Sequence, residues 1–522
     1  TRAVPNGREN EWGEPQLVSE NVVSDLRIVK SMTIDDKIAF WRKVMRHARD
    51  RGVDVYFITW NICLNGAAHP VPPYYRTYAN SIPDEQPGKY GITHDVHNPA
   101  TIAYLRDAVK TFILTYPDLK GIGVTAGEHF PRGDDYDREK WLWETYGLGI
   151  LDARAEQPAR TIEFIHRFWN TGFENIMRHW ADYPDPFAFS FKYARARLYS
   201  SPEVPFAAEH IASLKPRGLK SWWNLRNDDI FVHRWGDPDY VRAFIARFDR
   251  DVTAGYYVGS DGYVWGREFV SRQSRVPRQL EIEKHWFAFM LWGRLGYDID
   301  LGRDEILAAI RRHIPEADPA QLLEAWQAAS KIIPLVNRFY WRDWDHMWSV
   351  ENSQSHTEGY LGIEAFARGR TLEGSGLLSV SDYVGTLQRG EAPAGISPLQ
   401  VADEIDELAE TALAAADRIA GSGYELDRTL ADIRGMSYLG QYYADKIRAA
   451  VALALYQATG DEAHHRAAVD HASASYEHCT RYADHSQARY FPQMLARTGR
   501  FDWSVMLMEA RADVARLRHL HR

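Results

Sequence analysis

The sequence predicts an α/β fold, a (β/α)8 barrel of the TIM type followed by an all-α domain. Short β-rich stretches alternate with helical stretches as far as about residue 278, and long helical stretches then continue to the C-terminus. Strands that alternate with helices favour a parallel sheet with right-handed crossovers. We count six such strands, whereas a closed barrel of this type has eight.

The N-terminal half supplies these strands one after another. Residues 1–22 have loop composition, and Thr33 followed by Asp36 then predicts a capped helix start. Short stretches rich in β-branched and aromatic residues read as buried strands. The expected strands are Val53–Thr59, Leu119–Thr125, Thr161–Phe168, Phe187–Lys192, Ser221–Leu225 and Ala254–Val258, with helices at Pro99–Tyr116, Phe173–Trp180 and Tyr240–Phe248.

The C-terminal half reads as helical. Segments rich in Ala, Leu, Glu and Arg predict helices at Ala402–Ile419, Leu430–Thr459 and Glu462–Ala483, and Gly374–Gly395 has loop composition. We therefore expect an N-terminal loop region at 1–30, a barrel catalytic domain at 31–300 and a helical domain at 301–522. A homodimer through the helical domain is one expected assembly.

Composition excludes several classes of protein. The net charge of −9 argues against a nucleic-acid partner, which would need clustered Lys and Arg. No apolar run reaches the roughly 20 residues that span a membrane. Cys63 and Cys479 define neither a disulfide framework nor a metal site, and no cofactor is expected. The 18 Trp and 28 Tyr fit either a large aromatic core or rings that stack on sugars.

The first residue is Thr1 rather than Met, so we expect that a preceding segment was removed. We favour an exported or periplasmic location over the cytoplasm.

The predicted site lies where the barrel strands end, because barrel enzymes carry their active sites at the C-terminal face. Acids, bases, amides and indoles follow each expected strand. They are Trp60 and Asn61, Glu128 and His129, Arg167, Lys192 with Arg195 and Arg197, Asn224 and Arg226 with Asp228 and Asp229, and Asp261.

The carboxylates in this set suit glycoside cleavage, which uses one carboxyl group as acid and another as base or nucleophile. Glu128 directly follows an apolar strand and is the candidate acid; the alternative is a solvated loop residue. Asp228 and Asp229 are the candidate partners, and each could instead cap a helix or lie at the surface.

The cations in the set indicate an acidic substrate. Arg167, Lys192, Arg195, Arg197 and Arg226 would surround the same opening. A neutral sugar does not need them, whereas a uronate carboxylate would accept charge-assisted hydrogen bonds from them. The alternative is that they neutralise the nearby acids. Arg167 and Lys192 are the first candidates for binding the carboxylate, with Trp60, Asn61, His129, Asn224 and Asp261 as further contacts.

The chain resembles the α-glucuronidases of glycoside hydrolase family 67 in short motifs over roughly residues 30–350. Tyr90–Pro99, the helix after it and the strand ending at Glu128 follow the order of that family, and Gly259–Asp261 with Trp286–Asp298 resemble its closing segment. The resemblance implies that Glu128 is the general acid. It also implies that Arg167 and Lys192 bind the glucuronate and that the reaction inverts configuration.

Arg197 departs from the family pattern, because it stands where one of two base carboxylates is expected. The base role then falls on Asp228 or Asp229, with Asp228 preferred as nearer the strand end. The resemblance places Val55–Thr59 as the third barrel strand, so the first two would lie outside this chain, or on a companion segment that completes the barrel. The alternatives are a uronate lyase and an inactive carbohydrate-binding barrel. A lyase would use a Tyr, His or Lys as base beside an Arg, and His129, His166 and the cations leave room for it.

Overall fold

A computed structural model describes most of the chain. The described residues are 32–59, 91–93, 95–125, 134–169, 171–192, 201–203, 205–226, 232–259, 268, 270–276, 279–342, 348–355, 358–495 and 499–520. Among the described helices, none combines the length and apolar character required to cross a membrane.

Six parallel strands form one curled sheet in which each strand pairs with the next along the chain. They are β1 (Val55–Ile58), β2 (Leu119–Val124), β3 (Glu163–Arg167), β4 (Phe187–Lys192), β5 (Ser221–Arg226) and β6 (Thr253–Gly259). All six predicted strands are therefore present. The closed eight-stranded barrel stays a prediction.

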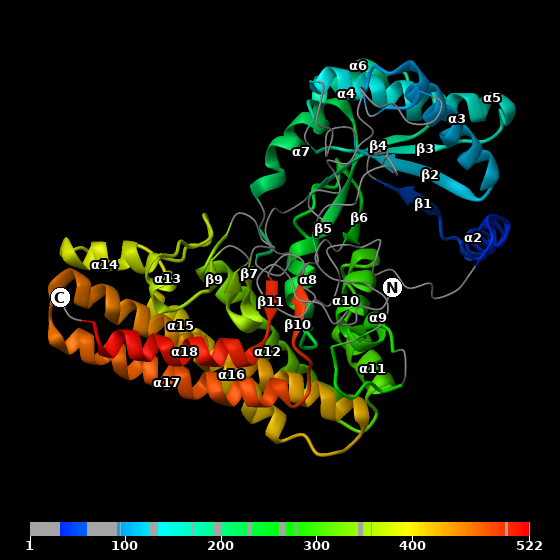
Figure 1. Ribbon diagram of the computed structural model, residues 1–522. Helices are drawn as coiled ribbons and strands as arrows, with labels where there is room; N and C mark the ends of the chain where they lie inside the picture. The colour runs from blue at the N-terminus through cyan, green and yellow to red at the C-terminus, as the bar shows by residue number, and fades with distance from the viewer. Residues whose placement is uncertain are drawn as a thin grey trace.

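Helices alternate with these strands (Figure 1). They are α2 (Ile34–Arg49), α3 (Pro99–Thr115), α4 (Asp135–Leu142), α5 (Leu148–Glu156), α6 (Phe173–Trp180), α7 (Ala208–Leu214) and α8 (Pro238–Ile245). The predicted cap of α2 is confirmed, since the Thr33 hydroxyl accepts from the Asp36 amide and the Asp36 carboxylate accepts from the Thr33 amide. The helical stretch at 135–156 was not predicted.

The rest of the described chain is mainly helical, as expected, and its long helices lie side by side at the lower left of Figure 1. The shorter elements are α9 (Glu281–Lys284), α10 (Trp286–Tyr297), α11 (Arg303–His313), α13 (Ile363–Arg368) and α14 (Val380–Gln388). The long helices are α12 (Pro319–Phe339), α15 (Pro398–Asp417), α16 (Tyr424–Thr459), α17 (Glu462–Gln487) and α18 (Trp503–Arg518).

Several elements differ from the expectations; α16, for example, begins at Tyr424 rather than Leu430. The stretch Gly374–Gly395 holds α14, which begins where the Ser379 hydroxyl accepts from the Asp382 amide. Helix α8 begins at Pro238 rather than Tyr240, because the Asp237 carboxylate caps it. Short strands also occur beyond residue 278: β7 (Trp348–Ser349), β8 (Gln354–Ser355), β9 (Gly359–Tyr360), β10 (Gln493–Leu495) and β11 (Gly499–Phe501).

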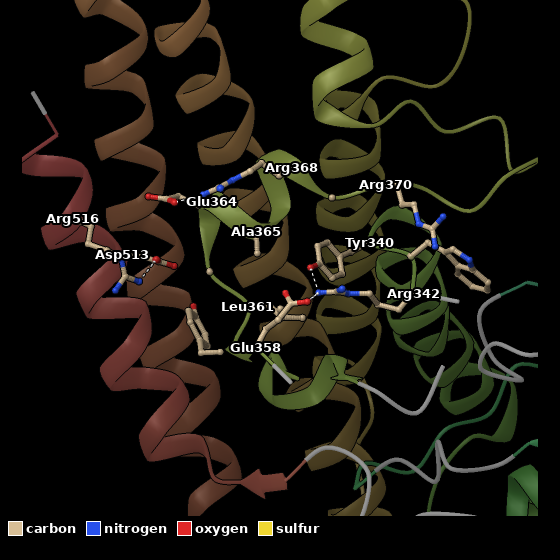
Figure 2. Close-up of a pocket in the computed structure, with 14 residues that line it drawn as sticks. Tyr340, Arg342, Glu358, Leu361, Glu364, Ala365, Arg368, Arg370, Asp513 and Arg516 are labelled. Carbon is tan, nitrogen blue, oxygen red and sulfur yellow. Dashed lines mark hydrogen bonds and ion pairs between the residues drawn. The ribbon is translucent and has the colours of Figure 1, made fainter. Parts of the chain in front are cut away.

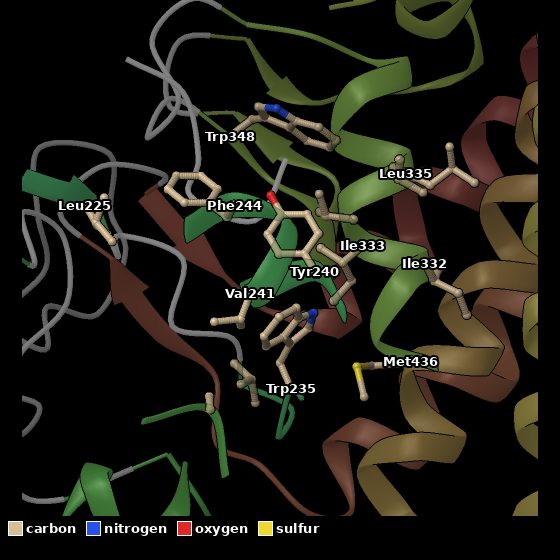
Figure 3. Close-up of a cluster of buried hydrophobic side chains, with 14 of the residues drawn as sticks. Leu225, Trp235, Tyr240, Val241, Phe244, Ile332, Ile333, Leu335, Trp348 and Met436 are labelled. Carbon is tan, nitrogen blue, oxygen red and sulfur yellow. The ribbon is translucent and has the colours of Figure 1, made fainter. Parts of the chain in front are cut away.

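An apolar core joins the segment after β5 to the long helices. Trp235, Tyr240 and Phe244 are buried in one core with residues of α12, and Ile333 points toward Tyr240 (Figure 3). The indole N–H of Trp235 donates to the carbonyl of Ser330 at 2.7 Å. Burying aromatic side chains of this size contributes several kcal/mol of transfer free energy, so the sheet region and the helices form one core here.

A buried charge network lies in the same interface. The Arg234 guanidinium donates to Asp432 of α16 at 2.8 Å and to Glu425 at 3.0 Å. Asp432 also accepts from the Arg234 amide at 3.0 Å and from the Tyr490 hydroxyl. The His233 ring lies 3.4 Å from Asp432. These buried groups satisfy one another's hydrogen-bonding capacity and charge without contact with solvent.

The thiol of Cys479 is free and buried in α17, and burial raises its pKa to about 12. Cys63 lies outside the described residues.

His210 predicts a measurable pH dependence of stability. Its ring stacks on that of Phe191, with the ring centres 4.2 Å apart, and its Nε2 lies 3.2 Å from the Ser221 hydroxyl. Burial lowers the pKa of His210 from 6.5 to about 3. The unfolded chain therefore binds a proton below pH 6.5 that the folded chain does not. We expect the free energy of unfolding to fall by about 1.4 kcal/mol per pH unit from this residue alone, from pH 6.5 toward pH 3.

The His210→Phe variant keeps an aromatic ring but cannot take up a proton. Urea unfolding at pH 7, 6 and 5 should show that the free energy of unfolding of the variant rises relative to that of the wild type as the pH falls. His519→Gln, at an exposed position, is the control and should follow the wild type. An equal change in the free energy of unfolding of the wild type and His210→Phe between pH 7 and pH 5 would contradict the prediction.

Candidate active site

The register of the sheet places several polar residues on one face. Arg167 pairs with Ser190, Lys192 pairs with Asn224, and Asn224 pairs with Tyr257. Paired residues share a face, and so do residues two apart in one strand. All five side chains therefore arise from the same face of the sheet. Arg167, Lys192 and Asn224 are among them, and their roles stay predictions.

This face is the inner side of the curl. The hydroxyls of Ser190 on β4 and Tyr257 on β6 lie 2.7 Å apart, although β5 separates the two strands. Strands two apart in a flat sheet are nearly 10 Å from each other, at about 4.8 Å per step. The two side chains can meet only by reaching across a concave surface, so Arg167, Lys192 and Asn224 point into it at the carboxyl ends of their strands.

An indole ring holds Lys192. The Lys192 ammonium lies 3.8 Å from the centre of the Trp169 ring, and Lys192 is only 8% exposed. A desolvated cation over an indole gains about 2 kcal/mol. The Thr125 hydroxyl donates to the carbonyl of Trp169 at 3.3 Å, which ties the ends of β2 and β3 together. The ammonium is thus fixed at the strand end.

Asn224 offers an acceptor. It is 7% exposed, and its side-chain oxygen has no hydrogen-bond partner among the described residues. Leaving a buried amide oxygen unpaired costs about 1–3 kcal/mol, so such a group in a native protein calls for an explanation, such as a water, an ion or a catalytic role. A sugar hydroxyl bound at this edge would satisfy it.

His166 lies on the other face of the sheet. Its Nε2 is 2.9 Å from the carboxylate of Glu139 on α4, and both side chains are buried. The Thr171 hydroxyl donates to the same carboxylate. The pair therefore fastens a helix to the sheet, and the expectation that His166 could serve as a base at the inner face is wrong.

The remaining predicted site residues lie outside the described part of the chain. They are Trp60, Asn61, Glu128, His129, Arg195, Arg197, Asp228, Asp229 and Asp261; Arg226 ends β5, but its side chain is not described. Their roles stay predictions. Trp169 follows β3 by two positions and contacts Lys192, although the sequence alone did not single it out from the other residues at that strand end.

Within the described ranges, no group of three His, Cys, Asp or Glu side chains is arranged to hold a metal ion.

Comparison with known proteins supports the fold. No family model matches the sequence, and no curated protein matches it. A GH138 enzyme targeting pectin rhamnogalacturonan II has a similar structure, with a TM-score of 0.73 and 18% identity over 94% of this chain and 72% of that chain. CpGH84B and CpGH84D align with TM-scores of 0.39 and 0.36, which are too low to bear on the fold.

The fold is therefore one that a solved glycoside hydrolase shares: a curled parallel sheet with a helical C-terminal region. The relationship to family 67 stays a prediction.

Proposed function

We propose that this protein is a glycoside hydrolase that removes a terminal uronic acid from an oligosaccharide or polysaccharide. The observation that carries the proposal is the pair of cations, Arg167 and Lys192, on neighbouring strands and on one concave face. A guanidinium and an ammonium together suit the two oxygens of a carboxylate. Asn224 beside them would accept from a sugar hydroxyl.

The proposed chemistry uses Glu128 as the acid that protonates the leaving oxygen. Asp228, or else Asp229, activates a water molecule on the opposite side of the sugar ring. An inverting pair of this kind is separated by about 6.5–9.5 Å, against about 5–5.5 Å for a retaining pair. The carboxylate of the sugar, held by Arg167 and Lys192, would orient the ring between the two acids.

The alternative functions differ in their products. A uronate lyase would need a base at the inner face, and His166 is turned to the helices, which leaves His129 as the histidine candidate. A binding-only barrel would need no acid at all. Uronate-bearing oligosaccharides, with a pectic fragment among them, would give a free uronic acid from a hydrolase. A lyase would give an unsaturated product that absorbs in the ultraviolet, and a binding protein would give no product.

Arg167→Ala tests charge recognition. The variant should weaken binding of a uronide much more than binding of the matching neutral hexoside, because only the uronide presents a carboxylate. Arg167→Lys should also be impaired, since a lysine cannot replace a bidentate guanidinium. Binding is measured by calorimetry on both ligands.

Arg217→Ala is the matched control, because Arg217 forms an exposed pair with Glu174 at 3.1 Å. It should bind both ligands as the wild type does. Equal losses on uronide and hexoside in Arg167→Ala would assign Arg167 a structural role only.

A further inference from the structure

A polar pocket lies between the end of α12, the β9–α13 segment and α18 (Figure 2). Its residues are distant in the sequence from those at the sheet edge. Its volume is about 740 Å³, within the range of about 300–1,000 Å³ that small-molecule sites occupy. Arg342 and Arg370 enter from one side, and Asp513 and Arg516 of α18 lie on the opposite side.

The pocket wall alternates donors and acceptors. Ion pairs join Arg342 to Glu358, Arg368 to Glu364 and Arg516 to Asp513. A guanidinium has five N–H donors and a carboxylate about four acceptor sites, so each pair keeps groups for a ligand. Sugar hydroxyls both donate and accept, and mixed walls of this kind suit them.

Arginine side chains supply much of the donor capacity of the pocket. Among the described residues that line it are four arginines and three carboxylates. The Arg342 guanidinium also donates to the Tyr340 hydroxyl at 3.0 Å, which fixes it beside an aromatic ring that lines the pocket.

The floor of the pocket is a built polar scaffold. The Lys446 ammonium, fully buried below it, donates to the carbonyl of Leu361, to the Ser353 hydroxyl at 2.9 Å and to the Tyr442 hydroxyl at 2.6 Å. The hydroxyls of Tyr442 and Tyr360 lie 2.8 Å apart. Since Tyr360 and Leu361 line the pocket, the ammonium holds its floor in place.

The carboxylate of Asp513 is also held in a fixed position. Its carboxylate accepts from the Ile363 amide at 3.1 Å. A Cβ at Gly362 would lie 2.6 Å from the same carboxylate, so a residue larger than glycine would displace it. Fixed polar groups of this kind are what a specific binding site requires.

We propose that this pocket is an accessory carbohydrate-binding site that takes uronate units of the substrate. The choice of an acidic sugar rests on the function proposed above, while the pocket, its wall and its floor stand independently. Such a site would anchor a polymer on the helical region while its chain end enters the sheet edge.

The experiment measures binding of a galacturonate trimer to the full chain by calorimetry, with a neutral galactose trimer as the comparison ligand. All proteins carry Arg167→Ala, so that binding at the sheet edge is weakened in every case. Adding Arg342→Ala or Arg370→Ala should lower affinity for the acidic trimer by tenfold or more. Arg368→Ala, at a side chain that is 77% exposed, is a further variant with little risk to folding.

Arg418→Ala is the matched control, because Arg418 forms an exposed pair with Glu324 at 3.2 Å outside the pocket. It should bind like its parent. Unchanged affinity in the pocket variants, equal binding of the neutral trimer, or equal competition by inorganic phosphate would each overturn the proposal. Trimer binding that depends on Arg342, together with a wild-type protein that releases no uronic acid, would sink the hydrolase function and leave the accessory site standing.

Discussion

Replacing Glu128 with Gln is expected to lower kcat on a uronide by about 10²–10⁴-fold, which is what general acid catalysis supplies. The amide cannot protonate the leaving oxygen, so departure of the aglycone becomes limiting. Glu128 follows Thr125, the last described residue after β2, by three positions. The measurement is steady-state release of uronic acid, with circular dichroism to verify the fold.

Two comparisons sharpen this test. An aryl uronide with a very acidic leaving group needs little protonation, so it should recover part of the lost rate. Glu209→Gln, at an exposed position of α7, should leave turnover unchanged. Near-normal turnover of Glu128→Gln on a natural substrate would remove this residue from the mechanism.

Replacing Asp432 with Ala is expected to lower the free energy of unfolding by about 3–5 kcal/mol, because it leaves the buried Arg234 guanidinium without its principal partner. Burial by itself would raise the pKa of Asp432, but the hydrogen bond to His233 and the charge of Arg234 outweigh it and hold that pKa well below its ordinary value. The carboxylate is therefore charged in the folded protein, and its stabilising contribution is complete above about pH 4. The contribution is lost as the pH falls further.

Urea unfolding at pH 7 measures the effect. The control is Asp403→Ala, which removes a carboxylate that is 71% exposed and paired with Arg448. An exposed pair contributes less than about 1 kcal/mol, so this variant should stay close to the wild type. A loss of similar size in both variants would mean that burial of the Arg234–Asp432 pair adds nothing.

The sequence predicted the parallel sheet well, because apolar strands bounded by turn residues leave a local pattern. Phe187–Lys192 is a strand with the predicted bounds, and alternation along it already places Ser190 and Lys192 on one side. Local patterns also misled where composition and capping disagreed. The Gly-rich stretch 374–395 looked like a loop, yet Ser379 begins a helix inside it.

Contacts between distant residues left no such pattern. Arg234 and Asp432 are 198 positions apart, and no sequence pattern near either residue indicates that they pair. The same holds for His166, whose partner Glu139 lies in a helix that was not predicted. Alternation along the strand does place His166 on the face opposite to Arg167, but it does not show that helix α4 packs on that face.

The interface around Trp235 bears on how the chain can be divided for expression. A fragment that ends near residue 300 would keep Trp235 and Tyr240 but lose α12, whose Ser330 carbonyl accepts from the Trp235 indole and whose Ile333 points toward Tyr240. It would also keep Arg234 and lose both of its carboxylate partners. Such a fragment would present a bare apolar patch beside an uncompensated cation and would aggregate. The sheet region and the helices should therefore be expressed together as one chain.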